Sequence, residues 1–414
     1  MLERLGRTVG TLCGLALLGA CLAAEARAGS GGDKFPRELV PKFNVPRIAA
    51  PPTIDGTIDP AEWKQATRLT GMSQVYSNRY YGRPHAFYVA WDPQHLYIAG
   101  RAHILPGHKL HKRFRERYVT GVVFDDAFEF GIGLFGRNKM PGEAESFFKF
   151  ILNYLGSGEY MKMYPSIGQY LYNWLPEMDV ASRLHEAEEG QFWEIEIAAD
   201  LADLQMPVEH KAGDLVKILL ATDLKNPGWE WACVPSSTGY LQHFGYPTAA
   251  LTAGEPYVQM ERLTGLDDER IDFRSVVHNP SDKPVNVVAR LQIVNSGTVE
   301  RKEVRNVPVD EQKALTVPPG GSVRFDVAKA FAGLNTKLLE DLRRTLGYNR
   351  VGSGGLAGSG ALSVLARIAA AEAGKLRAQE AVDAAGQERA DTGTLATMRA
   401  ASQGQRQALM DALL

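Results

Sequence analysis

Three polar residues on two predicted β-strands could bind a ligand rich in hydroxyl groups. Glu129 lies in "DDAFEFGIGLF", and Lys149 and Asn153 lie in "SFFKFILNYL". Because side chains alternate along a strand, each of the three falls on the face opposite the Phe128 or Phe148 series. A hydroxyl can donate a hydrogen bond to a carboxylate, accept one from an ammonium group, and do either with an amide. If the two strands are neighbours, and if "FWEIEIAA" with Glu194 and Glu196 joins them, one polar sheet face results.

Sugar recognition also needs aromatic side chains, on which the apolar faces of pyranose rings pack. Tyr118 and Tyr240 are the nearest candidates, and Trp174 stands in the aromatic-dense stretch "YMKMYPSIGQYLYNWLP". For that stretch, packing of a long connection against the core is the competing interpretation. The predicted ligand-binding set is Glu129, Lys149, Asn153, Tyr240, Tyr118 and Trp174.

Motifs of catalysis are missing from the sequence. It contains no HExxH, GxSxG, P-loop or paired-cysteine metal motif. Asp125, Asp126 and Glu129 could be read as glycosidase carboxylates, but carboxylates this close serve more often in turns or as ligands of calcium or hydroxyls. We therefore expect no enzyme and no cofactor, with structural calcium as an option.

The first residues predict export. Arg4 and Arg7 precede the apolar run "VGTLCGLALLGACLAA", and the small residues around Arg27 suit cleavage, so residues 1–28 are predicted to be a signal peptide. The run is shorter than the ~20 apolar residues that span a bilayer. We expect an extracytoplasmic protein, periplasmic, cell-surface or secreted, with no transmembrane span after signal removal; "LGAC" leaves a lipid anchor at Cys21 as an alternative.

Composition restricts the partners and the source of stability. Lys and Arg number 46 against 48 Asp and Glu, which gives no reason to expect nucleic acid or an anionic membrane. Only Cys233 remains outside the predicted signal, so no intrachain disulfide can form and the core must stabilise the fold alone.

The hydrophobic pattern predicts an all-β fold with further segments at both ends. Residues 29–47 are rich in Gly and Pro and predict a linker. Short aromatic and β-branched runs separated by turn residues predict a β-sandwich over 48–252, and similar runs predict a smaller immunoglobulin-like β module over 255–330. Residues 335–414 predict a helical, partly low-complexity tail.

An ordered set of motifs across residues 48–252 resembles the family 9-like carbohydrate-binding modules, β-sandwiches of the DOMON-like superfamily. The chain opens this region with "PPTIDGTIDPAEW" and continues with "VAWDPQHLYI", then "DDAFE", then "FKFILNY". It closes with Trp193, Glu196, Ile197 and Leu201, and with Phe244-Gly245. The resemblance implies a noncatalytic module that recognises a polysaccharide or oligosaccharide.

The resemblance also implies roles for single residues. In sugar-binding members, a Glu of the "DD..E" strand and an Arg and Asn of the next strand hold hydroxyls between two tryptophans. Glu129 and Asn153 match, whereas Ile151 stands at the Arg position, where Lys149 is expected to substitute. The opening stretch itself is expected to seal one end of the sandwich, with Trp63 on a short turn facing the core.

Two alternatives to glycan binding remain open. Some related sandwiches hold haem through Met and His, and Met161, Met163 and His185 are available here. A structural or scaffold role, in which the domain has lost its ligand and the tail from Ala361 docks elsewhere, is the other.

Overall fold

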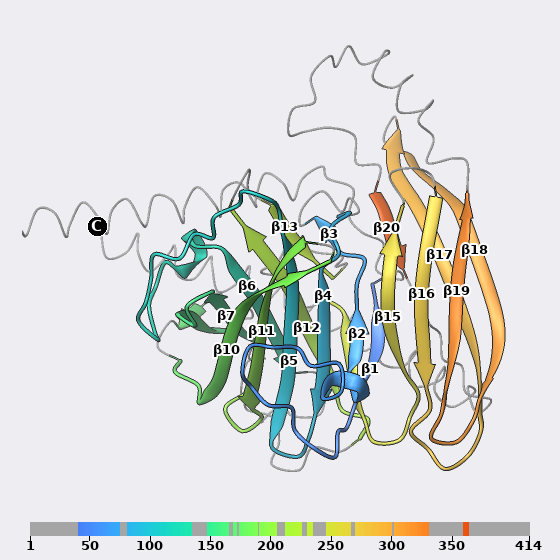
Figure 1. Cartoon of the computed structure of the whole chain (residues 1–414), viewed down its shortest axis with the longest axis horizontal. Helices are drawn as coiled ribbons and strands as arrows, with labels where there is room; N and C mark the ends of the chain where they lie inside the picture. The colour runs from blue at the N-terminus through green and yellow to red at the C-terminus, as the bar shows by residue number, and fades with distance from the viewer. Residues whose placement is uncertain are drawn as a thin grey trace, which may run out of the picture.

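A computed structural model describes most of the chain between residues 40 and 330. The described ranges are 40–74, 81–134, 147–164, 169–171, 174–188, 190–204, 212–225, 230–234, 246–265, 270–299, 302–330 and 359–363. The predicted signal peptide with Cys21, and the tail apart from residues 359–363, lie outside them. Strands make up nearly all of the regular structure (Figure 1), which confirms the all-β prediction. Within the described ranges, no helix has the length and apolar character needed to cross a membrane.

Two large sheets form the sandwich. The nine-stranded sheet follows the order β1 (Lys42–Pro46), β14 (Thr248–Thr252), β12 (Leu215–Leu224), β6 (Ala127–Leu134), β7 (Phe147–Asn153), β8 (Gly158–Tyr164) and β9 (Gln169–Leu171). Two short strands extend it beside β12, namely β13 (Glu230–Cys233) and β3 (Ser73–Gln74). The eight-stranded sheet follows the order β10 (Met178–Ala187), β11 (Gly190–Asp200), β5 (His95–Ile104), β4 (Ala86–Trp91), β2 (Thr67–Leu69), β15 (Tyr257–Thr264), β16 (Arg270–His278) and β19 (Ser322–Ala330).

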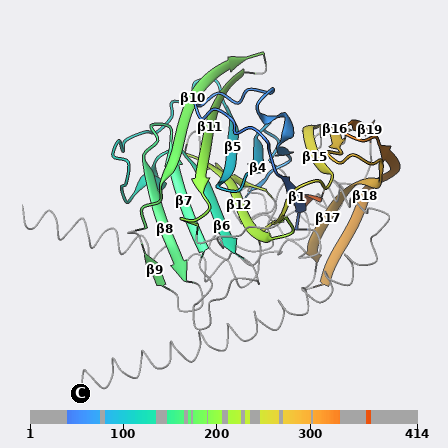
Figure 2. The same ribbon diagram turned by 90° about the horizontal axis from the view of Figure 1, so that it is seen from below.

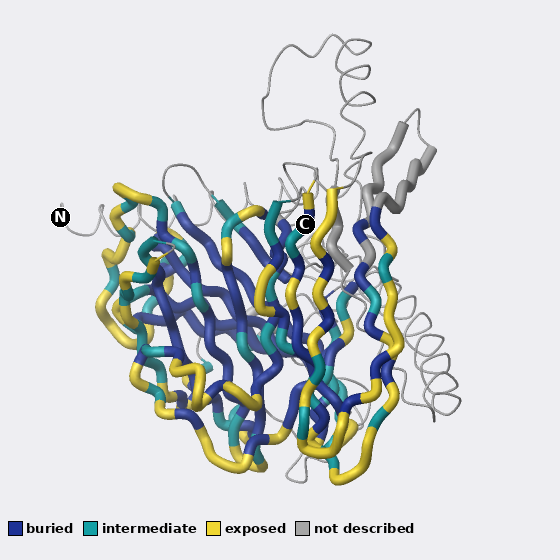
Figure 3. Tube along the Cα trace, turned by 45° about the vertical axis from the view of Figure 1, so that its right-hand side comes forward, coloured by how far each residue is buried: buried dark blue, intermediate teal, exposed yellow. Residues whose placement is uncertain are grey.

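The core lies between these sheets, and strand alternation builds it. Phe128 and Phe130 of β6 point inward and meet Phe87 of β4 and Trp193 of β11, with ring centroids 4.6 Å apart for Phe128 and Trp193. All four are buried, and Figure 3 shows the buried segments concentrated along the strands while exposed segments lie in the connections. Aromatic pairs of this kind are worth about 0.5–1.5 kcal/mol beyond their buried area.

A third sheet packs beside the end of the eight-stranded sheet (Figure 2). It is formed by β18 (Lys302–Val317), β17 (Val285–Val299) and β20 (Ser359–Ser363). Leu291 and Ile293 of β17 belong to the same continuous buried cluster as Phe273 and Phe325 of β16 and β19. The strands of the predicted immunoglobulin-like module therefore lie partly in the large sheet and partly in this third one.

Hydrogen bonds cross the predicted boundary between the sandwich and that module. β15 pairs in parallel with β2 at Gln259 and Arg68. The Gln259 amide also donates to the carbonyls of Lys64, at 3.1 Å, and Ala66, at 2.9 Å. An independent module from residue 255 stays a prediction, and β2, before that boundary, is a neighbour of β15, after it, in the same sheet.

Two segment predictions differ from the structure. Residues 42–46 of the predicted linker form β1, because Phe43 and Val45 alternate into the core while the backbone pairs in parallel with β14. Residues 361–363, predicted as the beginning of a helix, belong to β20, which pairs antiparallel with β17.

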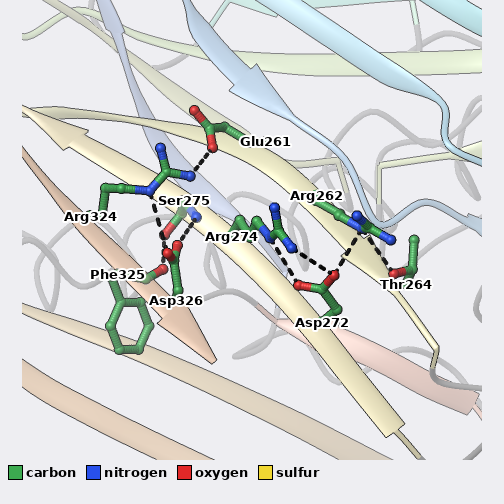
Figure 4. A network of polar contacts seen from close by, with 9 residues as sticks. All are labelled: Glu261, Arg262, Thr264, Asp272, Arg274, Ser275, Arg324, Phe325 and Asp326. Carbon is green, nitrogen blue, oxygen red and sulfur yellow. Dashed lines mark hydrogen bonds and ion pairs between the residues drawn. The ribbon is translucent and has the colours of Figure 1, made fainter. Parts of the chain in front are cut away.

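Exposed charges cover the outer surface of β15, β16 and β19, and they are paired (Figure 4). Arg262 and Arg274 both contact Asp272, each at 3.1 Å, and Arg324 contacts Glu261 and Asp326. Exposed ion pairs of this type contribute about 0–1 kcal/mol each. This surface is therefore solvated and electrically balanced.

Candidate ligand-binding site

Glu129 and Lys149 meet on the outer face of the nine-stranded sheet, as alternation predicts. β6 and β7 are neighbours, with Glu129 opposite Ile151 and Gly131 opposite Lys149. The Lys149 ammonium lies 2.8 Å from Oε2 of Glu129, and both side chains are 0% exposed. Oε1 of Glu129 has no hydrogen-bond partner among the described residues. Two buried charges thus pair directly, which is costly unless the geometry is good.

Asn153 lies on the same face, and its side-chain amide forms hydrogen bonds with the neighbouring loops. Its Nδ2 donates to Oδ2 of Asp125 at 2.8 Å and to the Phe114 carbonyl at 3.0 Å. Its Oδ1 accepts from the backbone N–H groups of Leu155 and Ser157. The structure therefore gives Asn153 a positioning role at the β7–β8 turn, in which its carbonyl acts as a turn acceptor.

The connection between β5 and β6, residues 105–126, covers this polar face; we call it the β5–β6 loop. Val122, within the 3₁₀ turn η3 (Val122–Phe124), is fully buried against a second apolar cluster on the outer face. Partly buried members of the loop, Phe114, Val119 and Val123, pack on that cluster too. The loop thus covers part of the face on which the buried Glu129 and Lys149 lie, and nothing in the β6 and β7 sequences reveals this cover.

Two carboxylates at the C-terminal end of the β5–β6 loop hold the backbone of its middle. Asp125 accepts from the N–H groups of Arg113 and Phe114 at 2.8 and 3.1 Å, and Asp126 accepts from the N–H of His111 at 2.5 Å. Both aspartates are 0% exposed. The "DD" of the "DD..E" motif thus anchors the loop from below.

Glu159 of β8 is a further buried charge on this face. Its Oε2 accepts from the Gly121 N–H at 2.8 Å. Burial raises the pKa of this carboxyl above its ordinary value, and the Gly121 bond and Lys149 partly oppose the shift. Lys149 therefore stands near two carboxylates, Glu129 and Glu159.

The predicted continuation of this polar row to Glu194 and Glu196 is wrong, because β11 belongs to the other sheet. There the two glutamates fix the opening stretch: Glu196 accepts from the N–H groups of Asp55 and Gly56 and from Trp63 Nε1, at 3.0, 2.8 and 2.7 Å. Glu194 accepts from the Ile58 N–H at 2.9 Å. Burial raises the pKa of Glu196, and these donors oppose the shift.

Trp63 lies on a short turn, as predicted, within the 3₁₀ turn η2 (Trp63–Gln65), and is 2% exposed. It packs with Ile58, Ala90, Tyr97 and Ala198 on the outer face of the eight-stranded sheet. The opening stretch therefore covers a sheet face. The prediction that it seals one end of the sandwich differs from this position.

The predicted aromatic residues lie apart from the polar pair. Tyr118 is 37% exposed and belongs to the β5–β6 loop, where its ring contacts Tyr160 at 5.2 Å and its hydroxyl donates to the Pro176 carbonyl. Trp174 is half-buried and packs on Phe148 at 4.7 Å, as the packing interpretation of its stretch expected. Tyr240 lies outside the described residues.

Three further exposed apolar side chains lie on segments that contact the Tyr118 segment; with Tyr118 we call them the Tyr118 patch, and the sequence did not reveal it. Phe124 is 45% exposed, Leu155 36% and Leu175 58%. The segments that carry them contact one another: Tyr118 forms a bridge with Gly158, at the end of the turn that holds Leu155, and its hydroxyl bonds the carbonyl of Pro176, next to Leu175. Asp125, next to Phe124, bonds Asn153 at the beginning of the same turn. The β-branched composition of "VVF" after Gly121 is typical of a buried strand, so it gives no signal of the exposed Phe124 ring.

The residues of the haem alternative point in different directions. Met161 belongs to the cluster on the outer face of the nine-stranded sheet. His185, on β10 of the other sheet, contacts the Gly56 carbonyl at 3.1 Å and Glu194 at 3.3 Å on that sheet's outer face. These two side chains do not meet at one iron, and the side chain of Met163 lies outside the described part.

Within the described ranges, no group of three His, Cys, Asp or Glu side chains could hold a metal ion, calcium included.

Comparisons with known proteins find similarity among solved structures only. No family model matches, and no curated protein matches. Among solved structures, a family 9 carbohydrate-binding module from Caldicellulosiruptor kristjanssonii, in complex with cellotriose, is 10% identical, covers 52% of this chain and 95% of its own length, and has a TM-score of 0.31. A putative carbohydrate-binding protein from Bacteroides uniformis is 14% identical, covers 51% of this chain and 97% of its own length, and has a TM-score of 0.35. A β-glucosidase from Kluyveromyces marxianus matches at 8% identity and a TM-score of 0.15, over 59% of this chain and 41% of its own.

Proposed function

We propose that this chain is an exported, noncatalytic glycan-binding protein whose ligand lies over the β5–β6 loop and the β7–β8 turn. The observation that carries the proposal is the Tyr118 patch, since Tyr118, Phe124, Leu155 and Leu175 are all exposed on segments that contact one another. Contiguous exposed apolar groups rimmed by polar residues are typical of binding surfaces. Apolar ring faces of sugars pack on aromatic side chains, and polar neighbours bind the hydroxyls.

The rigidity of Tyr118 supports this assignment. Its hydroxyl is fixed by the Pro176 carbonyl at 3.1 Å, and its ring is held by Tyr160. An aromatic side chain that is already ordered loses little conformational entropy when a ligand packs against it. The motif resemblance to sugar-binding modules agrees with a glycan as that ligand.

A noncatalytic role is supported by the carboxylates that could have suggested a glycosidase. Asp125 and Asp126 are buried and bond the backbone of the β5–β6 loop. Glu129 is buried and paired with Lys149. General acid and nucleophile roles require carboxyl groups that reach the scissile bond.

Contact of Glu129, Lys149 and Asn153 with a glycan stays a prediction of the resemblance. Such contact requires the β5–β6 loop to lift, because all three side chains are 0% exposed. Oε1 of Glu129, which has no donor among the described residues, would accept a hydroxyl once the loop lifts. The β5–β6 loop therefore separates two testable ligand positions, above it and beneath it.

Calorimetry against a panel of plant, algal and microbial glycans tests the proposal. We expect saturable binding that Tyr118→Ala weakens about tenfold, since the lost ring contact is worth on the order of 1 kcal/mol. Val288→Ala is the matched control, because Val288 has the same 37% exposure and lies on β17. Glu129→Gln weakens binding only for a ligand beneath the β5–β6 loop. An absence of saturable binding across the panel would refute the proposed function.

Periplasmic, cell-surface or secreted location is part of the same proposal. It is supported by the charged, apolar and small-residue pattern of residues 1–28. Cell fractionation of the full chain, combined with mass spectrometry of the mature N-terminus, separates cleavage before Gly29 from lipidation at Cys21. Recovery of the uncleaved chain in the cytoplasm would contradict it.

A further inference from the structure

The β5–β6 loop carries a run of positive charge on a chain that is nearly neutral as a whole. Between residues 105 and 124 it holds five cations and one acid, Glu116, while the formal net charge of the chain is −2. All five cations are exposed: Lys109, Lys112, Arg113, Arg115 and Arg117. We propose that this loop binds acidic glycans, polymers whose sugars carry carboxylate groups, an inference that rests on the proposed glycan-binding function.

The backbone beneath these cations is fixed. Asp125 and Asp126 hold the N–H groups of residues 111, 113 and 114, and Gly158 bonds the Arg117 carbonyl and the Val119 N–H, both at 3.0 Å. A surface whose backbone is already ordered binds a polymer without first losing the entropy of a mobile loop. The buried aspartates thus act as positioning residues for the cations above them.

The side chains differ in how they are engaged. Lys109 and Arg115 make no side-chain ion pair among the described residues, and the Arg113 side chain is 66% exposed. The Arg117 guanidinium lies 5.2 Å from the centroid of the Tyr118 ring, so a cation and an exposed aromatic ring are adjacent on the surface. A guanidinium can bond both oxygens of a carboxylate, while the ring receives the apolar sugar face.

The acids near the loop do not cancel this charge at the surface. Asp125, Asp126 and Glu159 lie beneath it and accept from its backbone. Arg113 lies 3.7 Å from Asp125, and Glu116 is the single exposed acid of the run. On the outer surface of β15, β16 and β19, by contrast, Arg262, Arg274 and Arg324 each face a carboxylate. Both surfaces expose arginine. The β5–β6 loop differs from the surface of β15, β16 and β19 because its arginines and lysines have few acidic partners.

The test compares polygalacturonate with its neutral methyl ester, using the full chain in calorimetry. We expect the acidic polymer to bind roughly tenfold more tightly at about 50 mM salt, and this advantage to shrink at about 300 mM because exposed charges are screened. The variant Lys109→Ser/Arg113→Ser/Arg115→Ser should lose roughly tenfold in affinity for polygalacturonate. Lys109→Ser/Arg115→Ser, which removes no side-chain ion pair between described residues, repeats the test with a smaller loss if the triple variant folds poorly.

The matched control removes the same charge from the balanced surface. Arg262→Ser/Arg274→Ser/Arg324→Ser should retain the affinity for polygalacturonate. Three outcomes would overturn the inference while Tyr118-dependent glycan binding still stands. The control could lose as much affinity as the loop variant, the methyl ester could bind as tightly as polygalacturonate, or the loop variant could keep its affinity. Binding to vesicles of anionic phospholipid without binding to polygalacturonate would also overturn it. If neither polymer nor any neutral glycan binds, the proposed function fails with it.

Discussion

The buried pair of Glu129 and Lys149 makes a quantitative prediction. The Nζ to Oε2 separation of 2.8 Å corresponds to an attraction of about 6 kcal/mol at an effective dielectric constant of roughly 20. Removing either partner leaves the other charge buried, which typically costs about 3–5 kcal/mol. Replacing both with apolar side chains removes the pair together with its desolvation cost, and such replacements are often neutral or stabilising.

We therefore expect Glu129→Met and Lys149→Met each to lower the free energy of unfolding by about 3–5 kcal/mol. The double variant should lower it by less than either single one, so the coupling energy exceeds about 3 kcal/mol. Glu159, near Lys149, makes Glu129→Met the milder single change. Urea unfolding with unchanged m-values measures all four forms. Additive losses would show that the two charges are solvated or paired elsewhere, and would refute the buried pair.

Two further predictions concern the sandwich. Burial, reinforced by the charge of Arg83, lowers the pKa of His85 to about 3. As the pH falls below 6.5, the imidazole therefore takes up a proton in the unfolded chain before it does so in the folded one. The free energy of unfolding should drop by about 1.4 kcal/mol per pH unit between about pH 6 and 4. His85→Leu should flatten that part of the profile in urea titrations, and an unchanged slope would contradict the buried neutral imidazole. Gly56 has φ +86°, and an added Cβ would lie 2.8 Å from the Ser182 backbone, so Gly56→Ala should cost roughly 2 kcal/mol or more. Gly107, with φ +81° and open space around it, is the control: Gly107→Ala carries the backbone strain without the clash, and equal melting temperatures would refute the close packing of the opening stretch.

Local sequence predicted the strands and their faces well. Alternation placed Phe128, Phe130, Phe148 and Phe150 in the core and Glu129 and Lys149 opposite them, as the structure shows. Period-two patterning survives because the packed interior accepts only one face of each strand. The turn around Trp63 was also predictable, since Asp59-Pro60 fixes its beginning.

Long-range placement was not predictable in the same way. Glu194 and Glu196 have the pattern of Glu129, yet β11 pairs with β5 and β10, and only the sheet order assigns it to the other layer. The cover of the β5–β6 loop depends on Asp125, Asp126 and Asn153 bonding its backbone across many residues. Local propensity contains no information on such contacts, because their energy appears only when distant segments meet. The patch around Tyr118 depends on the same contacts.

The parallel pairing of β2 with β15 has a practical consequence for the design of fragments of this protein. A fragment ending near residue 253 would leave β2 as a bare edge strand, and the carbonyls of Lys64 and Ala66 would lose the Gln259 amide that bonds them. Exposed strand edges recruit other chains. Glycan-binding assays on the isolated sandwich therefore risk measuring aggregates, and a fragment that ends after β19 keeps that edge paired.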